Sequence, residues 1–300
     1  HVAGLQVLVR SLLAGTEPVV LDLAGGFDPV AFADGSRMIS AGVSGGAVGA
    51  GAGRRYTALV PTQLRRLLSA GDDVVAALAS YDAVLLGGAA APPDLLAAAR
   101  AVGVRVVTTY GMSETCGGCV YDGVPLDGVR VRLGEDGRVE LGGTMVFAGY
   151  RGRPDLTSAA RRVDADGVAW HLTQDLGVLS DDGRLDVLGR VDDVIVTGGE
   201  KVAPALVERA LASYAGIREL AVVGVPDPEW GQRVVAVVVP ADAAAAPSLE
   251  KLRAHGAHRL PPYALPRSLV IADAIPLLGS GKPDRVALRA LAAPAAVQVG

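Results

Sequence analysis

Lys282 lies in a glycine-containing loop over residues 279–285 (Gly-Ser-Gly-Lys-Pro-Asp-Arg). It is one of only three lysines, with Lys201 and Lys251, in a chain that carries twenty-five arginines. Lysine is a compact, mobile point charge, whereas arginine is a planar fork. A loop that delivers one positive charge to a reacting centre is therefore better served by lysine. An ordinary solvated turn lysine is the alternative, and this loop alone does not decide between the two.

Residues 108–115 (Thr-Thr-Tyr-Gly-Met-Ser-Glu-Thr) follow a predicted buried strand. Ligands in open α/β sheets bind beyond the carboxyl ends of the strands. At such a place Ser113 can hold a phosphate oxygen, and Glu114 can bind Mg²⁺, which usually takes one or two carboxylates plus substrate phosphates. A polar turn with a capping serine is the alternative.

Asp175 and Arg190 are predicted at the open end of one β-hairpin, fifteen residues apart. An aspartate there can accept both hydroxyls of a ribose, and an arginine can donate to ribose or phosphate oxygens. The alternative is a surface ion pair, which contributes little stability. The string that follows, residues 189–201, joins a charged linker, an apolar strand and a glycine turn with Glu200 and Lys201. Folding alone does not require this whole combination of residues, so residues 189–201 are the most specific indication of function in the chain.

The elements that would position these residues fall into three groups. The first part alternates strand and helix signals, which predicts a parallel, layered sheet: strands over 19–23, 56–60, 83–86 and 104–108, and helices from Asp28-Pro29, over 61–68 and over 92–102. Asp-Gly turns then predict antiparallel hairpins, with strands over 129–133, 138–141, 177–179 and 184–188. The last group predicts a small α+β unit, with strands over 194–197, 220–225, 233–239 and 268–272, and helices over 204–215, 248–259 and 284–291.

These patterns predict an incomplete α/β large domain, with layered sheets and a small antiparallel sub-domain, followed by a small α+β C-terminal domain. We place the large domain over 1–191 and the C-terminal domain over 192–300. The chain begins at His1 on an apolar segment typical of the middle of a domain, so we expect a fragment or a shortened sequence.

Composition excludes several classes of protein. The formal net charge is −4 with no basic block and few aromatic residues, which argues against nucleic-acid binding. No apolar run reaches the length of a membrane span, so we expect a cytoplasmic protein. Cys116 and Cys119 could form a redox pair or half of a zinc site, but no second ligand pair exists. We therefore favour two reduced thiols. We interpret residues 41–53 as a flexible connection, because they lack the Gly-Lys-Ser/Thr ending of a phosphate loop.

Five segments, taken in chain order, resemble the adenylate-forming (AMP-binding) superfamily of acyl-CoA synthetases, and the similarity extends over essentially the whole chain. They are residues 87–90 (Gly-Gly-Ala-Ala), 110–114 (Tyr-Gly-Met-Ser-Glu), 173–175 (Thr-Gln-Asp), 189–192 (Gly-Arg-Val-Asp) and 281–282 (Gly-Lys). Within that superfamily, residues 1–4, 56–64 and 111–122 are most similar to the o-succinylbenzoate–CoA ligases of menaquinone biosynthesis, in their actinobacterial form.

The resemblance implies an acid–CoA ligase that uses ATP, Mg²⁺ and coenzyme A in two half-reactions. The carboxylate of an aryl acid would attack the α-phosphate of ATP, giving an acyl-adenylate and pyrophosphate. The thiol of coenzyme A would then displace AMP and give the thioester. The nucleotide-binding residues that the resemblance implies are Gly87, Gly88, Ala89, Ala90, Tyr110, Gly111, Ser113, Asp175 and Arg190.

The resemblance also implies individual roles. Tyr110 would stack on adenine, Ser113 would contact phosphate and Glu114 would bind Mg²⁺. Lys282 would bridge the carboxylate and the α-phosphate, as positioned positive charge is often the dominant electrostatic contribution to such a reaction. Asp192 would be a hinge whose rotation replaces Lys282 at the site by the loop of Gly198, Gly199, Glu200 and Lys201.

Two departures from the superfamily pattern bear on these expectations. Gln174 stands where relatives usually have glycine. The Lys-bearing loop that holds the β and γ phosphates has no counterpart, because in relatives it lies upstream of the segment that matches His1. The alternatives are therefore a ligase for another aryl or fatty acid, a truncated non-catalytic relative, and a carrier-loading adenylation domain. We expect no nucleic-acid partner and no membrane span, and leave a homo-oligomer open.

Overall fold

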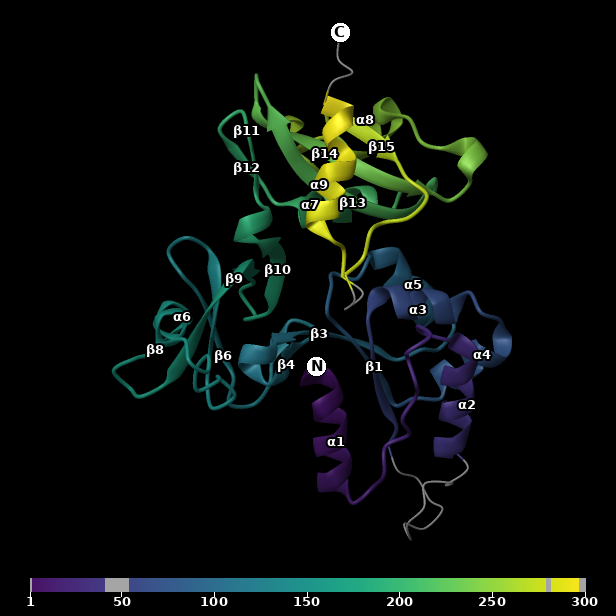
Figure 1. Cartoon of the computed structure of the whole chain (residues 1–300), viewed down its shortest axis with the longest axis vertical. Helices are drawn as coiled ribbons and strands as arrows, with labels where there is room; N and C mark the ends of the chain where they lie inside the picture. The colour runs from purple at the N-terminus through teal and green to yellow at the C-terminus, as the bar shows by residue number, and fades with distance from the viewer. Residues whose placement is uncertain (1, 41–53, 279–281, 297–300) are drawn as a thin grey trace.

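The computed structural model describes residues 2–40, 54–278 and 282–296. Its strands form three sheets, which Figure 1 shows with the helices that cover them. The connection predicted over 41–53 and the glycines of the Lys282 loop lie outside the described residues.

The first sheet has the order β1-β2-β3-β4-β5, with β1 to β3 parallel and β3 to β5 antiparallel. Its strands are β1 (Tyr56–Leu59), β2 (Ala83–Leu86), β3 (Val106–Met112), β4 (Gly117–Tyr121) and β5 (Val124–Pro125). The helices of this part are α1 (Val2–Ala14), α2 (Pro29–Ser40), α3 (Pro61–Leu68), α4 (Asp72–Ala79), α5 (Pro93–Ala101) and the short turn η1 (Ser113–Thr115).

Local chemistry explains why these helices begin and end where they do. Asp28 caps α2, since its Oδ1 accepts from the Val30 backbone N–H at 2.8 Å. Proline occupies the first position of α2, α3 and α5, where its missing N–H has no consequence. Gly103, at φ +82°, follows α5 in the left-handed conformation that ends many helices. Fully buried Leu64, Leu67 and Val84 lie in the core between the helices and the sheet.

The strand predicted over 19–23 is wrong. In the part of the chain that the structure describes, this segment pairs with no strand, although β1 lies at the edge of its sheet and pairs there with β2 alone. Leu21 packs instead beside Gly35 of α2, while the Val20 side chain is 81% exposed. Helices α1 and α4 were not predicted at all, and β3 begins two residues later and ends four residues later than predicted.

The second sheet has the order β10-β9-β7-β6, with β8 also paired to β9. Gly137 and Gly183 occupy positive-φ positions in the turns that join β6 to β7 and β9 to β10, so the hairpin prediction is confirmed. The elements are β6 (Arg130–Leu133), β7 (Arg138–Gly142), α6 (Pro154–Ala160), β8 (Arg161–Val163), β9 (Ala169–Leu179), β10 (Leu185–Arg190) and η2 (Val191–Asp193).

The third sheet, order β12-β11-β14-β13 with β15 parallel to β14, forms a C-terminal unit with helices on both faces (Figure 1). Alternate residues of the two long strands face opposite ways: Val223 and Val235 pack with Leu288 of α9, whereas Val222 and Val234 pack with Val207 of α7. The elements are β11 (Ile195–Thr197), β12 (Glu200–Val202), α7 (Pro204–Leu211), β13 (Ile217–Asp227), β14 (Gly231–Pro240), η3 (Ala243–Ala245), α8 (Leu249–Gly256), η4 (Pro262–Ala264), β15 (Ser268–Ile271), α9 (Arg285–Ala292) and η5 (Ala293–Ala296).

The predicted elements of this unit are present, but helix α7 ends four residues earlier than predicted. A search of the described residues for a helix long and apolar enough to cross a bilayer finds none.

Candidate active site

Lys282 is held at the base of its loop by backbone contacts on both sides. The Leu278 backbone N–H donates to the Lys282 carbonyl at 2.8 Å, and Leu277 and Pro283 form a β-bridge. The Lys282 Cε lies 3.9 Å from the position that a Cβ on Gly88 would take. The structure therefore brings the predicted catalytic lysine to the predicted adenine-binding segment, 194 residues away in sequence.

The segment over residues 87–90 presents mainly backbone. Gly87 packs closely under β3, since a Cβ there would lie 2.4 Å from the Thr109 Oγ1. Gly88 has φ +80°, and Gly88, Ala89 and Ala90 are exposed. Small residues leave this edge accessible to the flat face of a ring, and a larger side chain at Gly87 could not be accommodated without moving the strand.

Tyr110 and Gly111 lie within β3, not after it as predicted. The strand continues past Thr108, where it stops pairing with β2 and pairs with β4 instead. Gly111 permits this pairing, because a Cβ on it would lie 2.0 Å from the Gly117 carbonyl oxygen. The Tyr110 hydroxyl donates to the Asp175 Oδ2 at 2.7 Å. Burial, and then the negative charge of Asp175, raise the pKa of Tyr110 well above its usual value.

Asp175 and Arg190 face each other across the β9–β10 ladder, as predicted for the open end of a hairpin. The Asp175 side chain is 15% exposed, and its Oδ1 lies 3.8 Å from Nη1 of Arg190. Arg190 also donates to Asp192 at 2.9 Å, and this hydrogen bond raises the pKa of Arg190 above its usual range. The carboxylate of Asp175 thus lies between Tyr110 and a half-exposed guanidinium, where polar hydroxyl groups of a ligand could reach it.

Glu114 and Ser113 form the turn η1 at the end of β3. The Tyr150 hydroxyl donates to Oε1 of Glu114 at 2.7 Å, and the Phe147 N–H donates to the Glu114 backbone carbonyl. Burial and the hydrogen bond to Glu114 raise the pKa of Tyr150 to about 12. Sequence reasoning missed Tyr150, since nothing in its spacing connects it to a residue 36 positions earlier. Ser113 is exposed on the same turn.

Asp192 is exposed in η2, between β10 and the C-terminal unit. The next residue, Asp193, accepts from Arg289 at 3.2 Å and lies 3.8 Å from Arg285, both on α9. Arg285 also donates to Glu208 of α7 at 2.9 Å. We call Asp193, Glu208, Arg285 and Arg289 the Asp193 network; it ties the end of the linker to the helix that follows Lys282.

Gly198 and Gly199 form the two-residue turn of the β11–β12 hairpin, both with positive φ, as such turns require. Glu200 and Lys201 are exposed on β12. Figure 1 shows this hairpin on the left side of the C-terminal unit, whereas the chain before α9 descends toward α3 and α5. The structure thus places Lys282, and not the Gly198–Lys201 loop, against the α/β part.

Cys116 and Cys119 are both free thiols, one exposed and one buried. Burial raises the pKa of Cys119, so its reactive thiolate form is disfavoured. A search of the described residues for three or more His, Cys, Asp or Glu side chains in a metal-binding group finds none.

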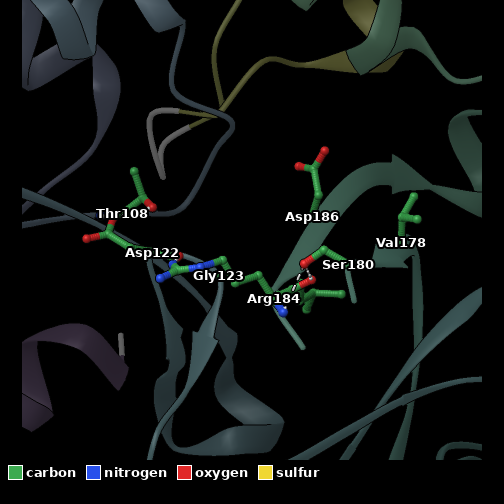
Figure 2. A pocket seen from close by; sticks show the side chains of 8 residues that line it. Thr108, Asp122, Gly123, Val178, Ser180, Arg184 and Asp186 are labelled. Carbon is green, nitrogen blue, oxygen red and sulfur yellow. Dashed lines mark hydrogen bonds between the residues drawn. The ribbon is translucent and has the colours of Figure 1, made fainter. Parts of the chain in front are cut away.

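A groove of about 590 Å³ lies between the first sheet and the β9–β10 hairpin (Figure 2). None of the site residues predicted from the sequence lines it. Several of its polar groups bond to one another: Thr108 donates to the Asp122 carboxylate through both N–H and hydroxyl, and Arg184 donates to the Asp122 carbonyl. Asp186 also lines the groove.

Two known protein families match parts of this chain. The AMP-binding enzyme family matches residues 53–151, and the AMP-binding enzyme C-terminal domain matches residues 206–282. A probable 2-succinylbenzoate–CoA ligase of Mycobacterium tuberculosis is 47% identical over 293 residues, which cover 96% of this chain and 71% of the relative. A feruloyl-CoA synthase of Amycolatopsis is 37% identical over 227 residues, 68% of this chain and 45% of the relative.

Among solved structures, the o-succinylbenzoate CoA synthetase of Bacillus subtilis in complex with its acyl-adenylate intermediate matches with a TM-score of 0.75 at 28% identity. The match covers 96% of this chain and 58% of that one. The chain thus spans less than two thirds of the solved structure it matches. The fold class predicted from the sequence, a large α/β domain followed by a small C-terminal domain, is confirmed. The chain belongs to the AMP-binding enzyme family of adenylate-forming ligases.

Proposed function

We propose that this protein is an ATP-dependent acid–CoA ligase that converts o-succinylbenzoate to its CoA thioester through an acyl-adenylate. The observation that carries the proposal is the approach of Lys282 to Gly88, next to the strand that carries Tyr110. The acid is supported by the 47% identity to the mycobacterial protein and by the likeness to the B. subtilis synthetase.

Each group at the site has a role that its surroundings permit. Gly87 to Ala90 would border the adenine ring, Tyr110 and Gly111 would line its other side, and Asp175 with Arg190 would hold the ribose. Lys282 would stabilise negative charge as it moves from the carboxylate to the α-phosphate oxygens. A fixed ammonium group placed before reaction needs no reorganisation in the transition state. Ser113 would donate to a phosphate oxygen.

The residues present fit a magnesium ion. Glu114 offers one carboxylate at the end of β3, with Tyr150 fixing one of its oxygens. This matches the preference of Mg²⁺ for one or two carboxylates together with substrate phosphates. When bound, the ion would neutralise phosphate charge, and Glu114 would hold it.

The second half-reaction would need a different orientation of the C-terminal unit. We propose that Asp192 is the hinge, that the chain divides into residues 1–191 and 192–300, and that Gly198, Gly199, Glu200 and Lys201 approach the thiol of coenzyme A after rotation. We further propose that the protein acts in the cytoplasm.

The proposal is tested by pyrophosphate release with Mg·ATP and o-succinylbenzoate, followed by thioester formation on adding coenzyme A. Ferulate and a medium-chain fatty acid serve as competing acids. Pyrophosphate release that depends on ferulate alone would show that ferulate, and not o-succinylbenzoate, is the substrate. Pyrophosphate release that needs no added acid would refute the proposed ligase function.

Lys282→Ala tests the role of the lysine. It should lower adenylation about 100-fold or more, the effect of losing one oriented charge donor. It should spare thioester formation from supplied acyl-adenylate. Lys251→Ala, on the exposed face of α8, is the matched control and should leave both unchanged. Equal loss of both half-reactions in the Lys282 variant would refute its role.

A further inference from the structure

Arg209 and Asp186 form a forked ion pair between the C-terminal unit and the second sheet. The Nη1 of Arg209 donates to Oδ2 of Asp186 at 2.8 Å, and its Nη2 donates to Oδ1 at 3.1 Å. Two parallel bonds of this kind give the strongest and most directional contact between guanidinium and carboxylate groups. The hydrogen bond raises the pKa of Arg209 above its usual value.

Arg209 is fixed within the C-terminal unit, and Asp186 is fixed within the second sheet. Arg209 lies on α7, whose Val207 and Leu211 are fully buried against the third sheet. Asp186 pairs with Val178 in the β9–β10 ladder, beside the buried Leu185. The pair can therefore form only when the two sides are correctly oriented.

The linker between the second sheet and the C-terminal unit is short and consists of η2. Among the residues that the structure describes, Arg209–Asp186 is the one ion pair that joins residues before Arg190 to residues after Asp193. In this same orientation the Lys282 Cε lies 3.9 Å from the Cβ position of Gly88. The Arg209–Asp186 pair thus exists together with the approach of the lysine.

We propose that Arg209 and Asp186 are positioning residues that favour the orientation in which Lys282 faces Gly88, and hence adenylation over thioester formation. This inference rests on the proposed function. Rotation at Asp192 that carries the lysine away must break the pair. Figure 2 shows the Asp186 carboxylate pointing away from Ser180 and Arg184, so it is not used within its own hairpin.

The exposure of the pair sets the size of the effect. The Arg209 and Asp186 side chains are 42% and 55% exposed, so water and salt weaken their attraction. A pair of this kind changes an equilibrium by about two- to fivefold. That is enough to favour one of two alternating orientations, and small enough to be broken in every cycle.

The test compares the two half-reactions in the full chain. Asp186→Asn should lower acid-dependent pyrophosphate exchange about two- to fivefold without slowing thioester formation from supplied acyl-adenylate. The exchanged pair, Asp186→Arg with Arg209→Asp, should restore adenylation to within about twofold of the parent. Asp182→Asn is the matched control, because its partner Arg184 lies on the same hairpin; it should change neither reaction.

Three results would overturn the inference: an equal fall in both half-reactions, no fall in Asp186→Asn, or no recovery in the exchanged pair. A parent protein without acid-dependent exchange would overturn the proposed function instead. In that case the role of the Arg209–Asp186 pair is tested by measuring the orientation of the C-terminal unit relative to the second sheet.

Spin labels at Asp166→Cys and Glu250→Cys, both exposed, report that orientation in a Cys116→Ser background. Asp186→Asn should broaden the distance distribution at low salt, and about 1 M salt should broaden it in the parent, since the screening length then falls to about 3 Å. An unchanged distribution in both would overturn the inference.

Discussion

Removing the hydroxyl of Tyr110 tests whether the site is held together by its own polar contacts. Tyr110→Phe keeps the ring that would stack on adenine and deletes only the group that donates to Asp175 at 2.7 Å. The Asp175 side chain is 15% exposed, and its ion-pair partner, Nη1 of Arg190, lies at 3.8 Å, beyond hydrogen-bond distance. The tyrosine is therefore the short-range partner of this carboxylate.

The expected loss follows from these numbers. A hydrogen bond to a charged group contributes about 1.5–3 kcal/mol. The lower end applies, because residual exposure lets water replace part of the contact. We expect Tyr110→Phe to lower the free energy of unfolding by about 1.5 kcal/mol, measured as a shift of the urea midpoint at constant slope.

Tyr121→Phe on the neighbouring strand is the matched control. Among the described residues, its hydroxyl accepts one long contact, 3.5 Å from Nη2 of the exposed Arg10. Its loss should change the free energy of unfolding by less than about 0.5 kcal/mol. Equal losses in the two variants, or none in Tyr110→Phe, would refute the reasoning.

The pH dependence gives a second signature. The pKa of Tyr110 is raised in the folded state, so its contribution is fully present below the usual pKa of 10.0. It falls as the pH rises above that value, because the unfolded chain ionises first. The stability difference between the parent and Tyr110→Phe should thus be level below pH 10 and shrink above it; a difference that grows would contradict the assignment.

Three further predictions concern neighbouring parts of the site. Gly111→Ala should lower the free energy of unfolding by about 2–4 kcal/mol, since its Cβ would lie 2.0 Å from a carbonyl oxygen of β4. Gly103→Ala should lower the free energy of unfolding by about 1 kcal/mol in the same urea assay, because its Cβ meets open space but its φ is +82°. A larger loss in Gly103→Ala than in Gly111→Ala would contradict the predicted clash at Gly111. Tyr150→Phe should raise the Mg²⁺ concentration for half-maximal pyrophosphate exchange about tenfold, because Glu114 loses the hydrogen bond that orients it. An unchanged Mg²⁺ requirement would show that Tyr150 does not position Glu114 for the ion. Asp192→Pro should slow thioester formation more than adenylation, because proline fixes φ and so restricts rotation at this residue. Equal slowing of the two half-reactions would refute the proposed hinge role of Asp192.

Local patterns predicted most of the secondary structure because its causes are local. Proline at a helix start, Asp28 as a cap and glycine turns act within a few residues, and the elements they mark are present. The segment over 19–23 shows the limit: its apolar residues suit a strand, but Leu21 packs beside Gly35 of α2, a distant contact that composition does not specify. Helix α1 was missed because its exposed Leu12 and Leu13, each 83% exposed, hide the usual amphipathic pattern.

The site was predictable as a set of motifs and not as a set of contacts. The structure brings Lys282 near Gly88 and pairs Asp175 with Arg190, whereas the roles that the resemblance implies for these residues stay predictions. The bond from Tyr110 to Asp175 joins residues 65 apart, and no spacing rule connects them. Such contacts depend on how the sheets pack, which only the folded chain reveals.

The Asp193 network has a mechanical consequence. Asp193 is bonded to the helix that begins three residues after Lys282, and Arg285 of that helix is bonded to Glu208. A torsion at Asp192, the proposed hinge, would therefore turn the end of the linker, α9 and the lysine together as one rigid arm. A modest change in one backbone dihedral angle would then become a large displacement of the ammonium group, with little of the motion lost to flexing within the arm.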